Sequence, residues 1–382
     1  MQTKIYADNA ATTKPDIEAI KAMLPYLEYE YGNASSLYAL ARKPKKILKD
    51  IRKKIASAIN AKPEEIYFTS GGTESDNWAI KGTAFALRNQ GNHIITSSVE
   101  HHAVLHSCSF LEKLGFDITY LPVDSRCEVS CKDLRAALRS DTILVSLILA
   151  NNEVGTIQNI KDLAFVSREN GITFHTDAVQ AVGHIPVDIG ALGVDMLSAS
   201  AHKFYGIKGV GFLYISSKRN DIIPYMSGGA QENGYRAGTE NIAGIVSMGV
   251  ALENNVQLIE EQKRKLTELE WIIISKLTYS KIDFIRNGSE NRLPGSMSLS
   301  FAGIEGERLL HRLDLMGIAV STGSACNSKS TEVSHVIKAM SVDSKYAYGT
   351  IRISFGKHNT IKDAEEIASA IVSICAKNKD IY

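Results

Sequence analysis

The feature that most constrains this chain is a series of short, almost wholly apolar runs between Glu65 and Ile215, separated by amphipathic stretches. The runs are too short for helices and contain few polar positions. Strands buried on both faces of a parallel sheet have this pattern, and the intervening helices cover the sheet. The runs predict strands at Glu65–Thr69, His93–Thr96, Asp117–Leu121, Ile143–Leu149, Ile172–His175, Met196–Ser198 and Gly211–Ile215.

Helical patterns lie between these runs, at Pro44–Ile59 and Asp133–Leu138 for example. The pattern changes after about residue 240. Asn241–Leu277 is long, helical in period and free of proline, so it predicts a helix that leaves the first domain. Strands near Gly295–Phe301 and Thr350–Ser354 and a last helix at Ile361–Lys377 suit a smaller α+β domain.

The sequence therefore predicts two domains. We expect a large cofactor-binding domain of residues 14–255 with a mostly parallel sheet. Residues 1–13 and 256–382 would form the small domain. A division of this kind agrees with the length of 382 residues.

Charge and the N-terminus narrow the class of protein. Lys and Arg number 43 and Asp and Glu 42, so the formal net charge is +1. This balance argues against nucleic-acid binding driven by bulk charge and against a polybasic membrane anchor. Residues Met1–Asp8 lack the apolar core of a signal peptide, and the most apolar stretch, Thr142–Ala150, is too short to span a bilayer. We expect a soluble, cytoplasmic protein.

Lys203 is the first candidate for chemistry. It follows the predicted strand ending at Ser198 and stands beside His202 and Ser200. A lysine whose pKa is lowered can form a Schiff base with a carbonyl compound. Considered alone, the position favours a solvated loop lysine, since most lysines are structural or solvated.

Asp177 and the segment Gly71–Thr73 are two further candidates. Asp177 ends a strand, where open α/β sheets place their sites, and could hold a pyridinium nitrogen. Gly71, Gly72 and Thr73 join a strand to a helix, and a helix N-terminus suits a phosphate. A helix N-cap and a plain turn are the alternatives for these two positions. Together with a Schiff-base lysine, however, they meet the three needs of pyridoxal phosphate.

Ordered motifs over nearly the whole length carry a resemblance. They are Tyr6–Thr13, Tyr31–Ser36, Thr69–Asn77, Glu100–His101, Asn151–Gly155, Asp177–Gln180, Ser200–Lys203, Gly228–Glu232, Arg236–Asn241 and Ser321–Cys326. With these motifs the chain resembles the cysteine desulfurases, pyridoxal-phosphate enzymes of the class V aminotransferase group. Its Ser-Gly-Ser-Ala-Cys type of loop is similar to that of one branch of the family. The resemblance implies a fold-type I α/β enzyme.

The resemblance also implies roles for single residues. Lys203 would bind the cofactor covalently, Asp177 would pair with its ring nitrogen, and Gln180 would bond its phenolic oxygen. His101 would stack on the ring and transfer protons. Gly72, Thr73, Ser200 and His202 would bind the phosphate. Thr239 would reach the phosphate in the partner subunit of a homodimer. Asn152 and Arg352 would hold the substrate carboxylate, with Asn152 also close to the cofactor.

Cys326 would be the sulfur-accepting nucleophile of this family. Its neighbours are small and polar with one lysine, which is typical of a surface loop. A thiolate there would take sulfur from L-cysteine, leave L-alanine and pass the sulfur to an acceptor protein. An iron–sulfur scaffold and a thiolation enzyme are both possible acceptors.

The other cysteines suggest no site. The chain has five cysteines, an odd number and a low density, which argues against a disulfide scaffold and favours a reducing compartment. Cys108 and Cys375 are expected in helices and in the core. Cys127 and Cys131 lack a second ligand pair with zinc spacing. We expect no metal site, and none at His101, His102 and His106, because the resemblance gives His101 another role and we expect no carboxylate ligand near these rings.

Three functions stay open on this evidence. The first is cysteine desulfuration. The second is another pyridoxal-phosphate reaction, selenocysteine cleavage or transamination. The third is a non-catalytic partner on the same fold. Lys203, Asp177 and His101 argue against the third, and Cys326 argues against transamination, which needs no nucleophilic thiol.

Overall fold

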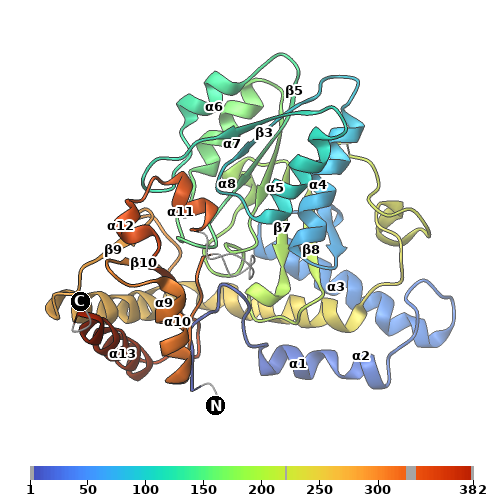
Figure 1. Cartoon of the computed structure of the whole chain (residues 1–382). Coiled ribbons are helices and arrows are strands. Elements are labelled where there is room, and N and C mark those ends of the chain that lie inside the picture. The colour runs from blue at the N-terminus through green and yellow to red at the C-terminus, as the bar shows by residue number, and fades with distance from the viewer. Residues whose placement is uncertain (1–3, 220–221, 324–332, 380–382) are drawn as a thin grey trace.

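The computed structural model describes residues 4–219, 222–323 and 333–379. Its largest element is a seven-stranded sheet in the order β2-β8-β7-β6-β5-β3-β4 (Figure 1). Neighbours from β7 to β4 are parallel, whereas β8 is antiparallel to both β2 and β7. The strands are β2 (Ile66–Thr69), β3 (His93–Ser97), β4 (Asp117–Leu121), β5 (Thr142–Ile148), β6 (Thr173–Asp177), β7 (Met196–Ser200) and β8 (Gly211–Ile215). The predicted mostly parallel α/β sheet is confirmed.

Alternate residues of each strand enter two different cores, which shows that both faces of the sheet are covered. Ile94 packs with the helices α4 (Gly72–Ala86) and α5 (His102–Glu112), while its neighbour Ile95 packs with α3 (Arg42–Ala58) and α7 (Ile160–Glu169). The same division separates Leu144 from Val145. Because successive strand side chains point to opposite faces, apolar residues are needed at every position of an inner strand.

One strand departs from this pattern. We expected Asp117–Leu121 to be buried, but in β4 Asp117 and Tyr120 are exposed. The strand pairs only with β3 and is the outer edge of the sheet. Side chains of an edge strand extend past the helices, so polar residues cost little there.

A second, smaller set of elements packs beside the sheet (Figure 1). It contains three antiparallel strands, β9 (Phe284–Asn287), β10 (Ser296–Phe301) and β12 (Thr350–Ser354). It also contains two helices, α10 (Gly306–Leu315) between β10 and β12 and α13 (Ile361–Lys379) after β12. The sequence predicted β10, β12 and the last helix but missed β9. It also missed the short parallel pair of β1 (Ile5–Tyr6) and β11 (Ile318–Ala319), which joins the N-terminal segment to this part.

The long helix predicted after residue 240 is confirmed as α9 (Ile242–Tyr279). Its first half buries Met248 and Leu252 in the core of the large sheet, and its second half buries Ile273 and Leu277 in the core of the small sheet. By length and composition α9 could cross a membrane, but 67% of its apolar window is buried inside the protein. It is therefore the helix that both cores share.

The remaining described elements are short. They are α1 (Ile17–Met23), α2 (Pro25–Glu28), α6 (Cys131–Ala137), α8 (Ile189–Leu192), α11 (His335–Ala339), α12 (Ser344–Ala347) and the 3₁₀ turns Ala39–Ala41, Pro63–Glu65, Ala201–Lys203 and Gln231–Gly234. Several begin at a side-chain cap; Ser130, for example, accepts hydrogen bonds from the first turn of α6.

Candidate active site

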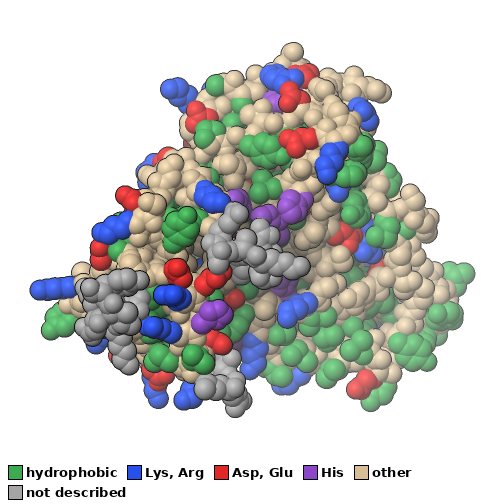
Figure 2. All heavy atoms as spheres, in the orientation of Figure 1, with side chains coloured by type: hydrophobic (Ala, Val, Ile, Leu, Met, Phe, Trp, Pro, Cys, Tyr) green, Lys and Arg blue, Asp and Glu red, His purple; other side chains and the backbone are tan. Residues whose placement is uncertain are grey.

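A cavity of about 570 Å³ lies where the carboxyl ends of the central strands meet the N-terminus of α4 and the small sheet. Open α/β sheets place ligands at this edge. Histidine side chains gather on the surface near it (Figure 2). Most residues that the resemblance assigned to cofactor and substrate line the cavity, namely Gly72, Thr73, His101, Asn152, Asp177, Gln180, Ser200, His202, Lys203 and Arg352.

Two of the predicted residues do not line it. Thr239 is exposed and lies outside the cavity of its own chain. Cys326 lies outside the described residues, although Gly323, at the end of the described chain before it, lines the cavity.

Asp177 lies on the floor of the cavity at the end of β6, as predicted. Its Oδ1 accepts a hydrogen bond of 2.9 Å from the backbone N–H of Val179, which fixes the carboxylate. Burial raises the pKa of Asp177 to about 6. A protonated ring nitrogen against this group would lower the pKa again, because an opposite charge stabilises the carboxylate.

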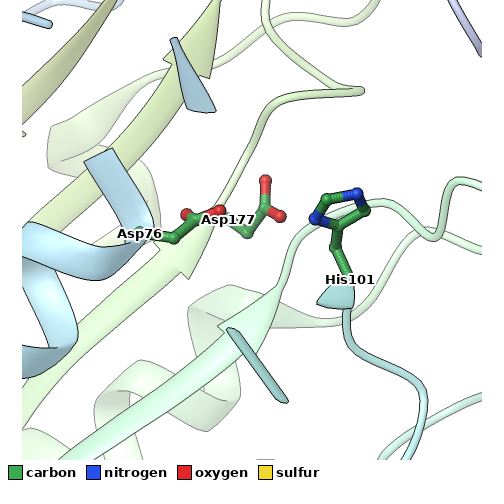
Figure 3. A group of neighbouring side chains, drawn as sticks. All are labelled: Asp76, His101 and Asp177. Atoms are coloured by element: carbon green, nitrogen blue, oxygen red, sulfur yellow. The ribbon is translucent and has the colours of Figure 1, made fainter. Parts of the chain in front are cut away.

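Asp76 is a second carboxyl group on the same floor, which the sequence analysis did not single out. It comes from α4 and is buried beside Asp177 (Figure 3). Among the described residues, its Oδ1 has no hydrogen-bond partner. Burial, and after it the charge of Asp177, raises the pKa of Asp76 well above the ordinary value. In the sequence, the only indication of Asp76 was that it is a polar residue on the buried face of α4.

A chain of hydrogen bonds supports this floor across three adjacent strands. Ser146 Oγ lies 2.8 Å from His175 Nδ1, and His175 Nε2 lies 2.9 Å from Ser198 Oγ. His175 Nε2 is also 3.7 Å from Asp76 Oδ1. Burial lowers the pKa of His175 to about 3, so the ring is neutral and relays polar contacts without adding charge.

His101 faces Asp177 across the cavity (Figure 3). It caps α5, where its Nδ1 accepts the backbone N–H of Ala103 at 3.2 Å, so the proton of the neutral ring is on Nε2. Burial, and after it Lys203, lowers the pKa of His101 to about 4. The ring is thus held neutral and in one tautomer.

We expected no carboxylate near His101 and used this as an argument against a metal site. That expectation was wrong. One atom from each of Asp76, His101 and Asp177 lies within 4.8 Å of the others. These carboxylates come from other elements and could not be placed from spacing. Two of the three groups are buried carboxyls with raised pKa values, so a metal ion would have to compete with a proton for them.

The N-terminus of α4 forms one end of the cavity. Its N-cap, Gly71, makes no side-chain cap hydrogen bond, so the first backbone N–H groups of the helix are available to a ligand. A Cβ on Gly72 would lie 2.5 Å from Cγ2 of Val179, so only glycine fits. Thr73, Ser200, His202 and Lys208 add hydroxyl, imidazole and ammonium groups around this end. This is an anion site.

Lys203 lies at the end of the turn that follows β7, as predicted. Its Nζ donates to the carbonyl oxygens of Ala10 at 2.5 Å and Ala11 at 2.8 Å. Gln180 Nε2 donates to the same Ala10 oxygen at 2.9 Å. The N-terminal segment therefore runs across the cavity and meets both side chains, a contact that no local pattern indicated.

Arg352 and Asn152 lie on the opposite wall. Arg352, from β12, is buried; its Nη1 donates to the backbone oxygen of Asn152 at 2.9 Å and its Nη2 to Asp8 Oδ1 at 2.7 Å. Among the residues that the structure describes, its Nε has no hydrogen-bond partner. A buried guanidinium with a donor still unpaired is suited to a carboxylate ligand.

These residues fit pyridoxal 5′-phosphate. The α4 N-terminus offers a phosphate cradle, the floor offers a buried carboxylate for a ring nitrogen, and Lys203 offers an amine between them. The unpartnered Asp76 Oδ1 and Arg352 Nε point to a ligand that completes the polar contacts of the cavity. The fold and site define a pyridoxal-phosphate enzyme with an α/β sheet.

Comparisons with known proteins agree. Residues 5–367 match the family model of aminotransferase class V. The chain is 51% identical to the cysteine desulfurase IscS of Dictyoglomus turgidum, over 100% of this chain and 97% of the relative. It is 49% identical to the cysteine desulfurase IscS of Methanosarcina thermophila, over 99% and 93%.

Solved structures give the same result. A NifS-like protein, 37% identical, superposes with a TM-score of 0.92 over 99% of this chain and 100% of its own. A structure described as SspA in complex with cysteine is 36% identical, with a TM-score of 0.83 over 94% and 100%. The chain therefore belongs to the aminotransferase class V family. Within that family it belongs to the cysteine desulfurases, and its cofactor is pyridoxal 5′-phosphate.

The described cysteines are unreactive in their surroundings. Cys108 and Cys375 are buried in helices, as expected, and Cys127 is buried too. Burial raises the pKa of Cys108 to about 12 and also raises that of Cys127 and of the half-buried Cys131. None of the three is a ready thiolate.

Proposed function

We propose that this protein removes sulfur from L-cysteine, leaves L-alanine and holds the sulfur as a persulfide on Cys326. The single observation that carries the proposal is the cavity that brings Lys203, Asp177 and Arg352 together from separate elements. The relative described in complex with cysteine supports the choice of substrate.

Each wall of the cavity has its own task. The N-terminus of α4, with Thr73, Ser200 and His202, would hold the phosphate, and Gln180 the phenolic oxygen. Asp177 would keep a proton on the ring nitrogen. When bound, pyridoxal phosphate supplies an electron sink for the electron pair left at the substrate Cα. Lys203 would be the covalent attachment point for the cofactor, and its amine would be the base that moves the α-proton.

The substrate would be oriented from the other wall. Arg352 and Asn152 would bind its carboxylate, with the unpaired Nε of Arg352 as one donor. The neutral ring of His101 would lie against the cofactor ring and hold its transferable proton on Nε2. The amine of the substrate would then point toward Lys203, and its sulfur would be free for attack.

In sulfur transfer the Cys326 thiolate would be the nucleophile. The thiolate attacks the substrate sulfur, so that an S–S bond forms as the substrate Cβ–S bond breaks. The electron pair of the broken bond stays on the substrate carbon, which takes up a proton and leaves as part of L-alanine. The persulfide then passes its outer sulfur to an acceptor thiol, or a reductant releases it as sulfide.

The proposed partners are an acceptor protein and a second copy of the chain. An iron–sulfur scaffold or a thiolation enzyme would take the sulfur. A homodimer is supported by Thr239, which is exposed outside its own cavity, and by exposed apolar side chains around α1 and α2. These include Leu27, Tyr29 and Leu37, which is 96% exposed. Hydrophobic side chains gather over the region of α1 and α2 in Figure 2.

We also propose the domain division expected from the sequence, 14–255 against 1–13 with 256–382. Its support is the membership of the two cores: Leu252 belongs to one, while Leu266, Ile5 and Ala7 belong to the other. A cytoplasmic location remains part of the proposal, because a persulfide-forming thiol must stay reduced.

The test is product formation with a thiol reductant. The purified protein with L-cysteine should give alanine and sulfide in equal amounts, and the C326A variant should lose nearly all of both. A C131A variant is the matched control and should keep wild-type rates. Undiminished alanine from C326A would contradict the proposal. L-Selenocysteine as substrate distinguishes the alternative lyase: C326A would retain that activity if no persulfide is needed.

A further inference from the structure

One buried carboxyl group lies between the two described ends of the chain around Cys326. It belongs to Glu153, which is 5% exposed and lines the cavity. The described chain before Cys326 ends at Gly323, and after Cys326 it resumes at residue 333, next to Ser334. Both Gly323 and Ser334 meet the Glu153 carboxylate.

The contact with Ser334 is a hydrogen bond. The Ser334 hydroxyl donates to Glu153 Oε2, and its oxygen accepts the N–H of Val336 at 3.1 Å, which caps α11. One serine thus joins the start of a helix to the buried carboxylate. When the Glu153 carboxyl is ionised, this hydrogen bond has a charged acceptor and is of a strong type.

The contact with Gly323 is steric. A Cβ on Gly323 would lie 2.2 Å from Glu153 Oε2 and 3.3 Å from the Cβ of Ser334. The φ angle of Gly323 is outside the range that side chains avoid, so backbone strain does not require glycine there. Among the described residues, it is the space taken by the Glu153 carboxylate that requires glycine at this position.

Glu153 is itself held rigidly. The turn at Asn151 binds the N–H groups of Glu153 and Val154 to Asn151 Oδ1 at 2.9 and 3.0 Å. Asn152 lies between Asn151 and Glu153 in the chain, and its backbone oxygen accepts the hydrogen bond from Arg352. Burial raises the pKa of Glu153 to about 7, against the effects of Ser334 and Arg352. One short turn therefore connects the substrate-binding wall with both flanks of the segment that contains Cys326.

We propose that Glu153 is a positioning residue that fixes Gly323 and Ser334, the two flanks of the Cys326 segment, and thereby sets the rate of sulfur transfer to Cys326. The inference rests on the proposed function of Cys326. It assigns Glu153 no part in cofactor binding or in the first proton transfer, because the described contacts of its carboxylate are with the flanks.

The test separates these steps in the full-length holoenzyme. Rapid mixing with L-cysteine follows the change in cofactor absorbance, which reports substrate binding and proton transfer. Alanine in a single turnover and the mass of the Cys326 peptide report sulfur transfer. E153A should slow alanine formation by about 10-fold to 100-fold, since small misplacements of reacting groups have effects of this size. The absorbance change should keep its wild-type rate.

A double variant makes the test independent of folding defects. G323A should slow alanine formation by a similar factor, since its methyl group meets the carboxylate. G323A/E153A should be no slower than E153A, because the added methyl then has room. E153Q should restore most of the rate, since its carbonyl oxygen can still accept from Ser334. S334A should be slow, whereas S130A, which removes a comparable helix cap far from the cavity, should not.

Several results would overturn the inference. They are unchanged alanine formation in both E153A and G323A, additive effects in the double variant, or an equal slowing of the absorbance change, which would place Glu153 in substrate binding. If wild type and C326A formed alanine equally, the proposed function would fail instead. If alanine formation depended on Cys326 but not on Glu153, only this inference would fail.

Discussion

The two walls of the cavity are built in different ways. The cofactor wall comes from neighbouring strand ends of one sheet, with Asp177, Ser198 and Ser200 in fixed register. The substrate wall is assembled from segments far apart in the chain: Asp8 to Arg352 is one contact and Asn152 to Arg352 another. A preformed floor suits a permanent cofactor, while a wall made of several segments suits a substrate that must enter and leave.

If this contrast is correct, damage to the cofactor wall should affect every step, and damage to the substrate wall should affect mainly binding and transfer. The largest effect is expected from K203A. Without the amine, the cofactor has no covalent attachment and the α-proton no base, so turnover should fall by about 10³-fold or more. The absorbance of the lysine-bound cofactor should disappear. An unchanged spectrum would show that the wrong lysine was assigned.

D177N should have the next largest effect. An amide cannot balance a protonated ring nitrogen, so turnover should fall by about 10²-fold to 10³-fold, the size found when a charge-stabilising group is removed. Cofactor titration followed by absorbance should show weaker binding as well. A variant with wild-type rates would place the ring nitrogen elsewhere.

On the substrate wall, R352K should act mainly on KM. Lysine keeps the charge but loses the forked geometry that binds a carboxylate, so KM for L-cysteine should rise by about 10-fold while kcat changes less. Steady-state kinetics at saturating cofactor measure both. A fall in kcat with unchanged KM would contradict the assignment of the carboxylate to Arg352.

The last prediction concerns stability, with no expected effect on the chemical steps. Glu100 is buried beneath the cavity, where Ser97 Oγ donates to its Oε1 at 2.5 Å and the N–H of Ile148 at 3.0 Å, and burial raises its pKa to about 8. The folded protein thus binds this proton more tightly than the unfolded chain does. Wild type should therefore lose unfolding free energy relative to E100Q as pH rises from about 4.5 to 8, by on the order of 4 kcal/mol.

Urea unfolding of both proteins at pH 5 and pH 8 checks this sign. Glutamine can accept the same two hydrogen bonds, so the variant should fold, and its advantage should appear only at the higher pH. An equal difference at both pH values would mean that Glu100 does not titrate in this range.

The same contrast explains what could be predicted from the sequence. Lys203, Asp177 and Gly72 follow or precede apolar strands, and a parallel sheet brings such strand ends to one edge, so local pattern located them. Asp76 was missed because one carboxylate on a buried helix face has no local signature. Its proximity to Asp177 depends on how α4 packs on the sheet.

The substrate wall was predictable only through the family resemblance. Nothing near Arg352 in the sequence indicates Asp8 or Asn152, since these contacts depend on how the N-terminal segment and the turn after β5 meet β12. The pair of β1 and β11 was missed for a related reason: two-residue strands have no periodicity. The edge position of β4 likewise depends on strand order, which propensity does not encode.

The most direct test of the central claim is a single turnover without reductant, followed by mass measurement of the protein and assay of alanine. The account predicts that one alanine per subunit appears and that the peptide containing Cys326 gains the mass of one sulfur atom. Alanine formed without sulfur on the protein, or sulfur found on another cysteine such as Cys131, would contradict it.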